Sequence, residues 1–563
     1  MTAMTAATSP RPGAAPIVRR VVVYTILFVL VVLTASGVSD LLGRLFDVVT
    51  GEQLAGTDTV GLAVSLTFTL IAGPLAAVLG WFAWRRLADP PERASLAWAL
   101  YLVGMGTLAL VVSATALLSA VAAAVTAEAV TAETATGLVW AGVWAGHGFV
   151  LRRTDRRPTR LPGTAAVLGG TFGLVIGAGG AVTALTMLVD EALAVGLGTD
   201  GAAGSVGSPW WTGAVQALVW AAGGALVWWW HWRRDGGRTA GTTLAGVALV
   251  GVGILGGALL TLTGTGTVVF VLLRLAVDRT DAVAVVCEPL GPAIAAALVG
   301  GLIWVYHRGV VRRRTAAVRQ ASTLVTSGIS LVAAATGLGV IVNALLATAT
   351  TPLSGSDPRT LLLGGISSLL VGGPVWWLTW RPATGPAADP RRSAGRSVYL
   401  VVVFGISAIV ALITLLVIGF RLFDTVLAGD PGLLDRIRAP LGLLAATALV
   451  AGYHFTVWRQ DRAATAATAP PAPPASAPAA PPAGVVGELV LVMGPGAEPV
   501  VTHLRRLTGA PVVYWQRAGG TAVLPNPAHV EQALHGVSGD RVLLIVGVDG
   551  TLTVIPVAAA QVA

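Results

Sequence analysis

The sequence predicts an α-helical polytopic membrane protein of about twelve transmembrane helices, arranged as six tandem hairpins and followed by a small C-terminal soluble α/β domain. Three observations carry this prediction. The chain of 563 residues is 55% hydrophobic and only 11% charged, with a mean hydropathy of +0.78, whereas soluble domains contain about 25% charged residues. Apolar runs long enough to cross a bilayer core of about 30 Å recur along the chain. Arginines gather in every second break between these runs.

Residues 1–17 are expected to form a disordered cytoplasmic N-terminus, and residues 18–462 a transmembrane domain of tandem helical hairpins. Apolar runs between polar breaks define the spans. Their predicted positions are 18–40, 61–84, 95–124, 134–151, 164–189, 211–232, 241–273, 288–307, 321–348, 360–380, 397–420 and 439–458.

The arginines orient these spans. With the N-terminus inside, the inside segments through Arg462 carry 25 of the 36 arginines, whereas the six outside loops carry 7. An excess of arginine on the cytoplasmic side is the main determinant of orientation. We therefore expect a multi-pass protein of the bacterial cell (inner) membrane, with both termini cytoplasmic. The net charge of +9 is spread along one membrane face, so nucleic acid is not expected as a partner.

An aromatic and arginine motif ends every even-numbered span. Its six versions are WFAWRR (81–86), WAGHGFVLRR (144–153), WWWHWRR (228–234), WVYHRGVVRRR (304–314), WWLTWRP (376–382) and YHFTVWRQDR (453–462). Tryptophan and tyrosine are enriched at the lipid headgroup boundary, and arginine lies just beyond it. The recurrence predicts internal repeats, with the first and sixth hairpins most alike. It leaves open whether the repeating unit has two or four helices.

With Arg19-Arg20 before an apolar helix, hairpins closed by W-x-x-H or W-x-W and arginines, and a small α/β tail, the chain resembles an uncharacterised family of actinobacterial repeat membrane proteins. The resemblance covers the whole chain. It implies a membrane domain of unknown function with a small cytosolic C-terminal domain, and it implies no activity.

Four histidines share a place near the predicted cytoplasmic helix ends: His147, His231, His307 and His454. In W-x-x-H, the tryptophan and the histidine lie one turn apart on the same helix face. Haem ligation or proton sensing is one reading of this set. However, the first and fifth hairpins lack the histidine. We therefore expect partly buried, hydrogen-bonded residues of the membrane interface, with no cofactor and no bound metal.

Arginine and aspartate recur just past the outer boundary, where each pair shares a helix face. The pairs are Arg44 with Asp47, Arg274 with Asp278, and Arg421 with Asp424. Salt bridges that tie neighbouring repeats together are the favoured interpretation. A vestibule that selects charged ligands is the alternative.

Between their boundaries the spans contain almost no ionisable residue apart from the histidines, and their amides are essentially Gln216 and Asn343. Proton-coupled transporters usually carry acids or bases within the membrane, so the pattern argues against that class. Sodium coupling through broken helices stays open, although Gly-Pro pairs at 73–74, 291–292 and 373–374 more often mark helix starts or kinks. No nucleophile–base set or zinc spacing indicates an enzyme, and the single Cys287 excludes an intramolecular disulfide.

Residues 463–483 form an Ala/Pro-rich linker, and residues 484–563 are expected to be a cytosolic α/β domain. Strands at 488–493 and 511–516, helices at 499–507 and 527–535, and a final hairpin around Asp549-Gly550 predict the order β-α-β-α-β-β. The GPGAEP turn resembles a phosphate-binding loop but lacks the full glycine fingerprint, so a plain tight turn is expected.

The leading functional hypothesis is a non-enzymatic membrane scaffold or regulatory module. It would contact membrane lipids and bind a protein partner through its C-terminal domain. The alternative is a transporter or lipid-handling protein with a mostly apolar pathway. Twelve helices with internal repeats suit a transporter only by analogy of fold.

Overall fold

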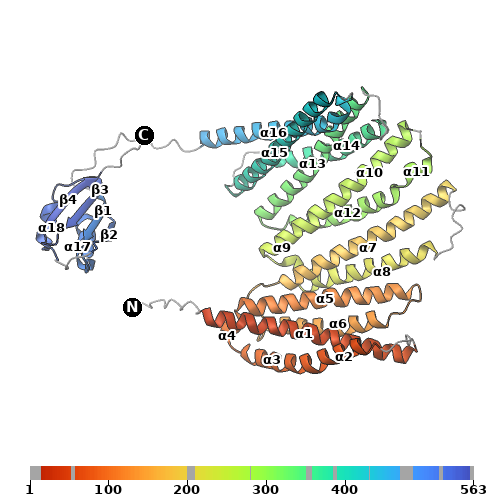
Figure 1. Cartoon of the computed structure of the whole chain (residues 1–563), viewed down its shortest axis with the longest axis horizontal. Coiled ribbons are helices and arrows are strands. Elements are labelled where there is room, and N and C mark those ends of the chain that lie inside the picture. The colour runs from red at the N-terminus through yellow and green to blue at the C-terminus, as the bar shows by residue number, and fades with distance from the viewer. Residues whose placement is uncertain are drawn as a thin grey trace. The chain divides into compact units, whose positions relative to one another are not determined.

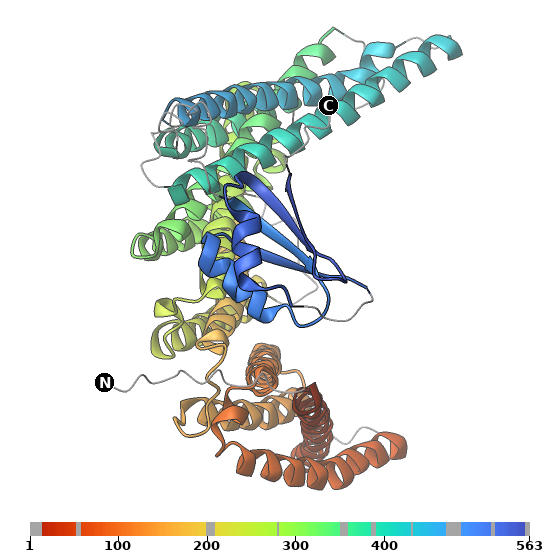
Figure 2. The same cartoon turned by 90° about the vertical axis from the view of Figure 1, so that its left-hand side faces the viewer.

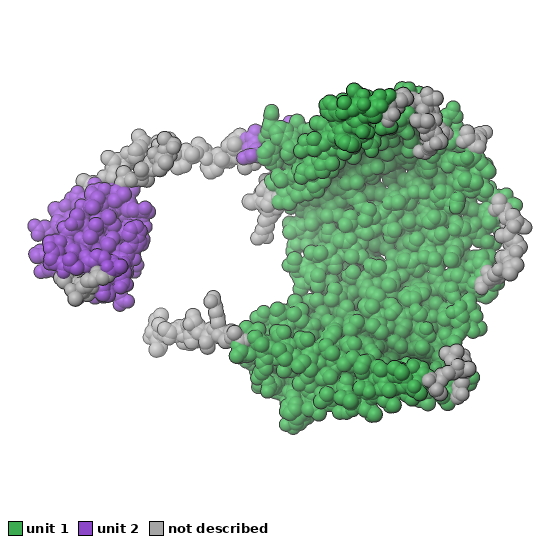
Figure 3. Space-filling view, in the orientation of Figure 1, with its two compact units in different colours: residues 1–459 green, residues 460–563 purple. Residues whose placement is uncertain are grey.

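The computed structural model describes residues 14–51, 58–198, 209–278, 281–349, 358–383, 390–429, 432–468, 486–518 and 524–557. The chain divides into two compact units, Met1–Arg459 and Gln460–Ala563 (Figure 3). Most of the predicted N-terminal segment (residues 1–13) and of the predicted linker (residues 469–483) lies outside the described residues.

Every predicted span is helical, and the helices of unit 1 form six antiparallel hairpins. Hairpin 1 consists of α1 (Ala14–Thr50) with α2 (Thr59–Thr67), the π-helical turn η1 (Phe68–Ala72) and α3 (Gly73–Arg86), and hairpin 2 consists of α5 (Leu96–Ala124) and α6 (Thr131–Arg152). Hairpin 3 consists of α7 (Thr164–Leu197) with α8 (Trp210–Trp229) and η2 (Trp230–Arg234), and hairpin 4 consists of α9 (Thr243–Ala248), η4 (Leu249–Gly256) and α10 (Gly257–Val277) with α11 (Val283–Cys287) and α12 (Leu290–Val311). Hairpin 5 consists of α13 (Ala316–Ala347) and α14 (Pro358–Ala383), and hairpin 6 consists of α15 (Pro390–Ala428) and α16 (Leu433–Thr468). The short α4 (Pro90–Arg93) and η3 (Gly237–Thr239) lie between hairpins.

Several helices run past their predicted bounds. Helix α1 begins at Ala14, so the last four residues of the segment predicted to be disordered are helical. Helix α16 continues to Thr468, six residues into the predicted linker. Alanine and arginine are strong helix formers, and they let both helices continue beyond the apolar run that marked the span. The Gly373-Pro374 pair lies inside the continuous α14 and does not break it.

Ten helical segments of the described residues are long and apolar enough to cross a membrane. The predicted spans 134–151 and 211–232, which correspond to α6 and to α8 with η2, are not among the ten. The count of twelve is therefore not confirmed. The physical reason is composition: α6 carries Glu133 and three threonines, and α8 is rich in tryptophan and glycine, which contribute less hydropathy than leucine or valine.

The six hairpins follow one another in chain order, from the red hairpin 1 to the teal hairpin 6 (Figures 1 and 2). Each hairpin packs mainly on the next one: α1 on α6, α5 on α8, α7 on α12, and α10 on α14. This is the neighbour-to-neighbour arrangement of repeat proteins. Large apolar side chains remain exposed along the helices, for example Leu302 at 74% and Leu416 at 65%. Such faces suit contact with lipid.

Glycines let the two helices of a hairpin approach closely. In hairpin 3, a Cβ at Gly173 of α7 would overlap the backbone of Trp228, and one at Gly224 of α8 would overlap Gly177. Small residues at such spacing bring membrane helices into backbone contact. Hairpin 4 uses the same device, because a Cβ at Gly300 would lie 2.7 Å from the nitrogen of Thr261.

The described part of unit 2 contains β1 (Val486–Met493), α17 (Glu498–Thr508), β2 (Val512–Gln516), α18 (Pro527–Leu534), β3 (Gly539–Val546) and β4 (Leu552–Val557). The sheet order is β2-β1-β3-β4, with β1 parallel to β2 and β3, and β4 antiparallel to β3. This matches the predicted order of elements.

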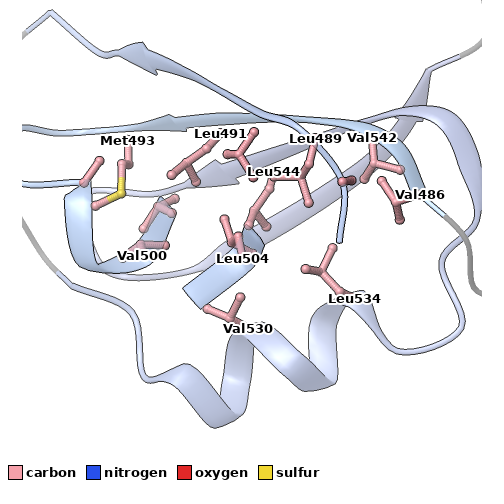
Figure 4. Packing of buried hydrophobic residues seen from close by; sticks show 14 residues of the cluster. Val486, Leu489, Leu491, Met493, Val500, Leu504, Val530, Leu534, Val542 and Leu544 are labelled. Atoms are coloured by element: carbon pink, nitrogen blue, oxygen red, sulfur yellow. The ribbon is translucent and has the colours of Figure 1, made fainter. Parts of the chain in front are cut away.

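Both helices of unit 2 cover the same face of its sheet. Val500 and Leu504 from α17, and Val530 from α18, pack against Leu489 and Leu544 of the strands (Figure 4). Contacts between α17 and α18 agree with this arrangement. The described residues of the domain therefore form a two-layer α/β fold in which one face of the sheet has no helix.

Candidate functional site

The four predicted histidines are held in the same way by their own helices. In each, Nδ1 lies 2.8–2.9 Å from the backbone carbonyl oxygen four residues earlier. His231, His307 and His454 are only 5%, 3% and 0% exposed. The expectation of partial burial is therefore wrong for these three, because neighbouring helices cover the rings, whereas their place at the membrane interface stays a prediction. His147 is half-buried, and its Nε2 lies 3.2 Å from the Tyr101 hydroxyl.

Two of the histidines belong to aromatic clusters between hairpins. Between hairpins 3 and 4, the Trp232 indole Nε1 donates a 3.0 Å hydrogen bond to the Tyr306 hydroxyl. Between hairpins 5 and 6, Trp380 donates the equivalent 2.8 Å bond to Tyr453. The ring centroid of the following histidine lies 5.7 Å from Trp232 in the first cluster and 5.5 Å from Trp380 in the second.

A second tryptophan completes each cluster in the same geometry. Trp228 meets Tyr306 at 5.4 Å and 74°, and Trp376 meets Tyr453 at 5.6 Å and 76°. Edge-to-face pairs of this kind are favourable. The agreement shows that hairpins 3–4 and hairpins 5–6 are equivalent at this end, and so indicates a repeating unit of four helices.

Hairpins 1 and 2 keep part of the pattern but lack two of its rings. Alignment of the helix ends places Trp84 with Trp232, Gly80 with Trp228, and Gly146 with Tyr306. A cavity of about 280 Å³ lies there, lined by Gly80, Gly146, Trp84 and His147 among others. The missing aromatic pair therefore corresponds to an empty, mostly apolar space.

His231 occupies a different place from the other three histidines. It precedes Trp232, so its equivalents in hairpins 1 and 5 are Ala83 and Thr379. Its ring packs between hairpins 2 and 3, 6.0 Å from the Trp144 ring and directly against Gly169. Its Nε2 is 4.0 Å from the Asp235 carboxylate. The W-x-x-H spacing alone did not separate this residue from the rest.

The predicted arginine–aspartate pairs form in part. Arg274 lies 3.6 Å from Asp278 and also binds Asp281. Arg44 instead bonds to Asp40 at 2.8 Å and to Asp58 at 3.0 Å. The backbone N–H of Gly61 and the Arg44 guanidinium together hold the pKa of Asp58 below its usual value.

The third pair is also rearranged. Asp424 lies 3.5 Å from Arg436 of α16, and Arg421 donates to the carbonyl oxygen of the same residue. The contacts of Arg421 and Asp424 therefore join the two helices of hairpin 6.

Polar contacts at these helix ends join successive hairpins, but the contacts named below are not the predicted arginine–aspartate salt bridges. The first helix of one hairpin meets the second helix of the next in all five interfaces. Thr131 donates to Asp47, Gln216 to the Ala122 carbonyl at 3.1 Å, Thr360 to Asp278 at 3.5 Å, and Arg438 to Asn343 at 3.3 Å, while the Asp190 carboxylate lies against Gly291. Both amides that the sequence singled out, Gln216 and Asn343, serve these contacts.

Among the residues that the structure describes, no group of three His, Cys, Asp or Glu side chains could hold a metal ion. The absence of a cofactor stays a prediction. The GPGAEP turn is closed by the Tyr514 hydroxyl, which donates to the Gly494 carbonyl at 2.8 Å. Glu498 stands in the first turn of α17 and would repel a phosphate there. This supports the plain turn.

One buried carboxylate was not predicted from the sequence. Glu92 of α4 is 6% exposed and accepts hydrogen bonds from Arg20 at 2.9 Å and from Tyr24 at 3.2 Å. It anchors the start of α1 to the segment before α5. The signal was available: Glu92 is one of few acids in segments that are otherwise rich in arginine.

The fold and these interfaces define a helical repeat array with a small C-terminal sheet domain. Residues 20–146 and 321–452 match the family described as a domain of unknown function (DUF5671). These are hairpins 1–2 and hairpins 5–6, so the two copies agree with a four-helix unit and fit an uncharacterised repeat family. No curated protein and no solved structure matches the chain.

Proposed function

We propose that the chain is a non-enzymatic membrane scaffold whose cytosolic C-terminal domains join copies of it to one another. The row of hairpins is the observation that supports a membrane scaffold. Each hairpin packs mainly on its neighbours in the sequence, and the polar contacts at the outer ends link successive members. A row of this kind provides a long lateral surface to lipids and to other membrane proteins.

The transporter hypothesis predicts a pathway enclosed by helices that are distant in the sequence, as in folds where two repeats surround a midplane site. Three cavities of unit 1 lie instead between adjacent hairpins: hairpins 1 and 2, hairpins 2 and 3, and hairpins 4 and 5. This distribution favours the scaffold over the transporter.

The proposed self-association of the C-terminal domains is based on the uncovered face of the sheet in unit 2. The exposed side chains on this face are largely apolar: Val513 at 38%, Trp515 at 60%, Ile555 at 41% and Val557 at 40%. Half-buried Val492, Leu543 and Ile545 lie between them on the central strands. An exposed apolar patch on a soluble domain commonly marks an interaction surface.

The occupant that best fits this face is a second copy of the same face. A two-fold axis between β1 and β3, parallel to the strands, would place β1 opposite the β3 of the other copy. Glu488 and Arg541 are neighbours across β1 and β3, 2.5 Å apart. The axis would therefore bring each Glu488 over the Arg541 of the other copy.

The same axis would place the outer strand β2 over β4. The largest exposed ring, Trp515, shares its row of the sheet with Val492, Ile545 and the smaller Thr553, so Trp515 would meet Thr553 across the interface. Sheets stack face to face at about 10 Å. Four strands give a face only about 19 Å wide, so each contact is weak. Confinement to one membrane raises the effective concentration.

Crosslinking of the full-length chain in membranes tests this proposal. The sole cysteine, Cys287, is buried and is replaced by alanine in all chains. Two differently tagged chains are expressed together, one with Trp515→Cys and one with Thr553→Cys, and treated with a short bis-maleimide. We expect a heterodimeric product from this pair. Arg506→Cys lies on the helical layer and serves as the matched control, because it should not crosslink to either position.

A yield for the Trp515–Thr553 pair no higher than that of the control would refute self-association through this face. Charge reversal gives a second readout. Glu488→Arg or Arg541→Glu alone should reduce crosslinking, and the two reversals, one on each of two mixed chains, should restore it. Equal yields in all four combinations would also count against the proposal.

A further inference from the structure

A cavity of about 580 Å³ lies between hairpins 2 and 3 of unit 1, at the end where α6 leads into α7. Its apolar wall comes from α5 and α6 and includes Leu110, Trp144 and Gly148. Its polar wall comes from the connection between α6 and α7 and from η2. No role of the scaffold uses this space.

Three arginines line the polar wall: Arg152, Arg157 and Arg160. Arg152 is 3.3 Å from Asp235, the one acid that lines the cavity. The guanidinium groups of Arg157 and Arg160 make no hydrogen bond or ion pair with any residue that the structure describes. With His231 neutral, the cavity wall therefore carries a surplus of two positive charges.

The backbone that presents these arginines is strained. Leu161 adopts a φ of +53°, and Gly163 adopts a φ of +70°. A bulky side chain at positive φ is rare, and such strain concentrates at functional sites. This turn lies between Arg160 and the start of α7, and its residues line the cavity.

Aromatic residues in and beside the cavity indicate its level in the bilayer. Trp144 and His231 both line it, and the Trp230 ring lies 6.5 Å from Trp144 and 5.7 Å from the Arg152 guanidinium. Tryptophans beside arginines mark the headgroup region of a bilayer. One wall thus faces the level of lipid phosphates, and the other extends toward the acyl chains.

We propose that this cavity binds the phosphate group of an anionic phospholipid, with Arg157 and Arg160 on the phosphate and the first part of an acyl chain against Trp144 and Gly148. Planar guanidinium groups bind phosphate oxygens with paired hydrogen bonds, and basic pockets between helices on the cytoplasmic side suit anionic headgroups. A soluble phosphate would use the same arginines but would leave the apolar wall uncovered.

Thermal unfolding of the full-length chain in a neutral detergent tests the site. The added probes are dioctanoyl phosphatidylglycerol, dioctanoyl phosphatidylcholine and inorganic phosphate. The wild type should be stabilised most by phosphatidylglycerol. Arg157→Gln with Arg160→Gln should weaken its apparent affinity by about tenfold or more, because each arginine–phosphate contact is a charged hydrogen bond. The matched control, Arg312→Gln with Arg313→Gln, removes the same charge from the exposed connection after α12 and should behave as the wild type.

A second variant guards against misfolding of the double substitution. Gly148 has open space around it and lines the cavity, so Gly148→Phe should fill the apolar wall, keep the arginines and lower the affinity for phosphatidylglycerol. Equal responses of the cavity and control variants would overturn the proposal, as would no response of the wild type. A response to inorganic phosphate as large as that to phosphatidylglycerol would assign the site to a soluble phosphate and refute the lipid.

Discussion

The indole of Trp380 donates a 2.8 Å hydrogen bond to the hydroxyl of Tyr453 across the interface of hairpins 5 and 6. Trp232 and Tyr306 repeat this bond at 3.0 Å across hairpins 3 and 4. Trp380 and Trp232 are only 1% and 6% exposed, so their indole N–H groups need a partner, and the tyrosine hydroxyls provide it. The bond therefore fixes how two hairpins dock within a four-helix unit.

Hairpins 1 and 2 offer a test of that docking, because glycines occupy two of the ring positions. Gly80→Trp and Gly146→Tyr together should fill the 280 Å³ cavity and raise stability by about 0.5–2 kcal/mol, as cavity filling commonly does. A Cβ at Gly80 would be 3.9 Å from its nearest neighbour, and Gly146 has open space. Thermal unfolding in detergent measures the effect.

The two single variants are the controls for this pair. If the rings meet edge to face as Trp228 and Tyr306 do, the gain in stability of the double variant should exceed the sum of the gains of the two single variants, because the effects of contacting residues are not additive. Additive or destabilising behaviour would show that the cavity does not correspond to the missing pair.

Packing of the buried histidines predicts a contrast between two glycines of η4. A Cβ at Gly253 would lie 2.6 Å from the His307 ring, whereas one at Gly251 would meet nothing within 4 Å. Gly253→Ala should destabilise the chain by about 1–3 kcal/mol through overpacking. Gly251→Ala should be neutral or stabilising, since alanine is the better helix former.

His307→Ala provides the coupling test for this contrast. In its presence the penalty of Gly253→Ala should largely disappear, because the clash has been removed. A penalty that persists would place its origin outside the contact with the ring. Unfolding midpoints of the four variants in one detergent supply the measurement.

A measurement of membrane topology distinguishes ten spans from twelve. If α6 and α8 cross the membrane, reporter fusions after Arg86, Arg157, Arg234 and Arg462 should report cytoplasm, and fusions near Gly56, Asp200 and Asp357 should report the outside. If neither helix crosses, the fusion after Arg157 should report the outside and that near Asp200 the cytoplasm. The excess of inside arginines favours twelve, and one reversed loop between two correct ones would contradict it.

The C-terminal domain should fold without the membrane unit. Residues 484–563 expressed alone are predicted to give a dispersed amide spectrum by NMR. Leu504 is 0% exposed, so Leu504→Ala should lower the unfolding free energy of the domain by about 2–5 kcal/mol. Leu507 on the same helix is 42% exposed, and Leu507→Ala should change stability by less than about 1 kcal/mol. Similar losses at both positions would contradict the observed core.

Much of the fold could be predicted from the sequence because the relevant signals are local. Uninterrupted apolar runs gave the helical segments, and alternation with turn residues such as Asp549-Gly550 gave the order of elements in unit 2. Helix limits were less accurate, since α1 and α16 continue on alanine and arginine after the apolar run ends.

Contacts between hairpins could not be predicted, because spacing along a helix fixes a face but not the neighbour that covers it. Asp47 shares a helix face with Arg44, but it accepts a hydrogen bond from Thr131 of hairpin 2, while Arg44 binds Asp40 and Asp58 of its own hairpin. The four-helix unit was hidden because Gly80 and Gly146 stand where the other units have aromatic rings. From the sequence, the arginines of the cavity indicated only the orientation of the spans. Their position beside Trp144 depends on the packing of hairpins 2 and 3 and could not be predicted.

The most direct test of the scaffold is to count copies of the full-length chain by single-molecule photobleaching in liposomes at low surface density. We expect the wild type to photobleach mainly in two or more steps. Leu543→Asp with Ile545→Asp, which places charge on the uncovered sheet face, should photobleach in one step, whereas Arg506→Glu on the helical layer should match the wild type. A wild type that photobleaches in one step, or face variants that assemble as the wild type does, would contradict self-association through the C-terminal domain.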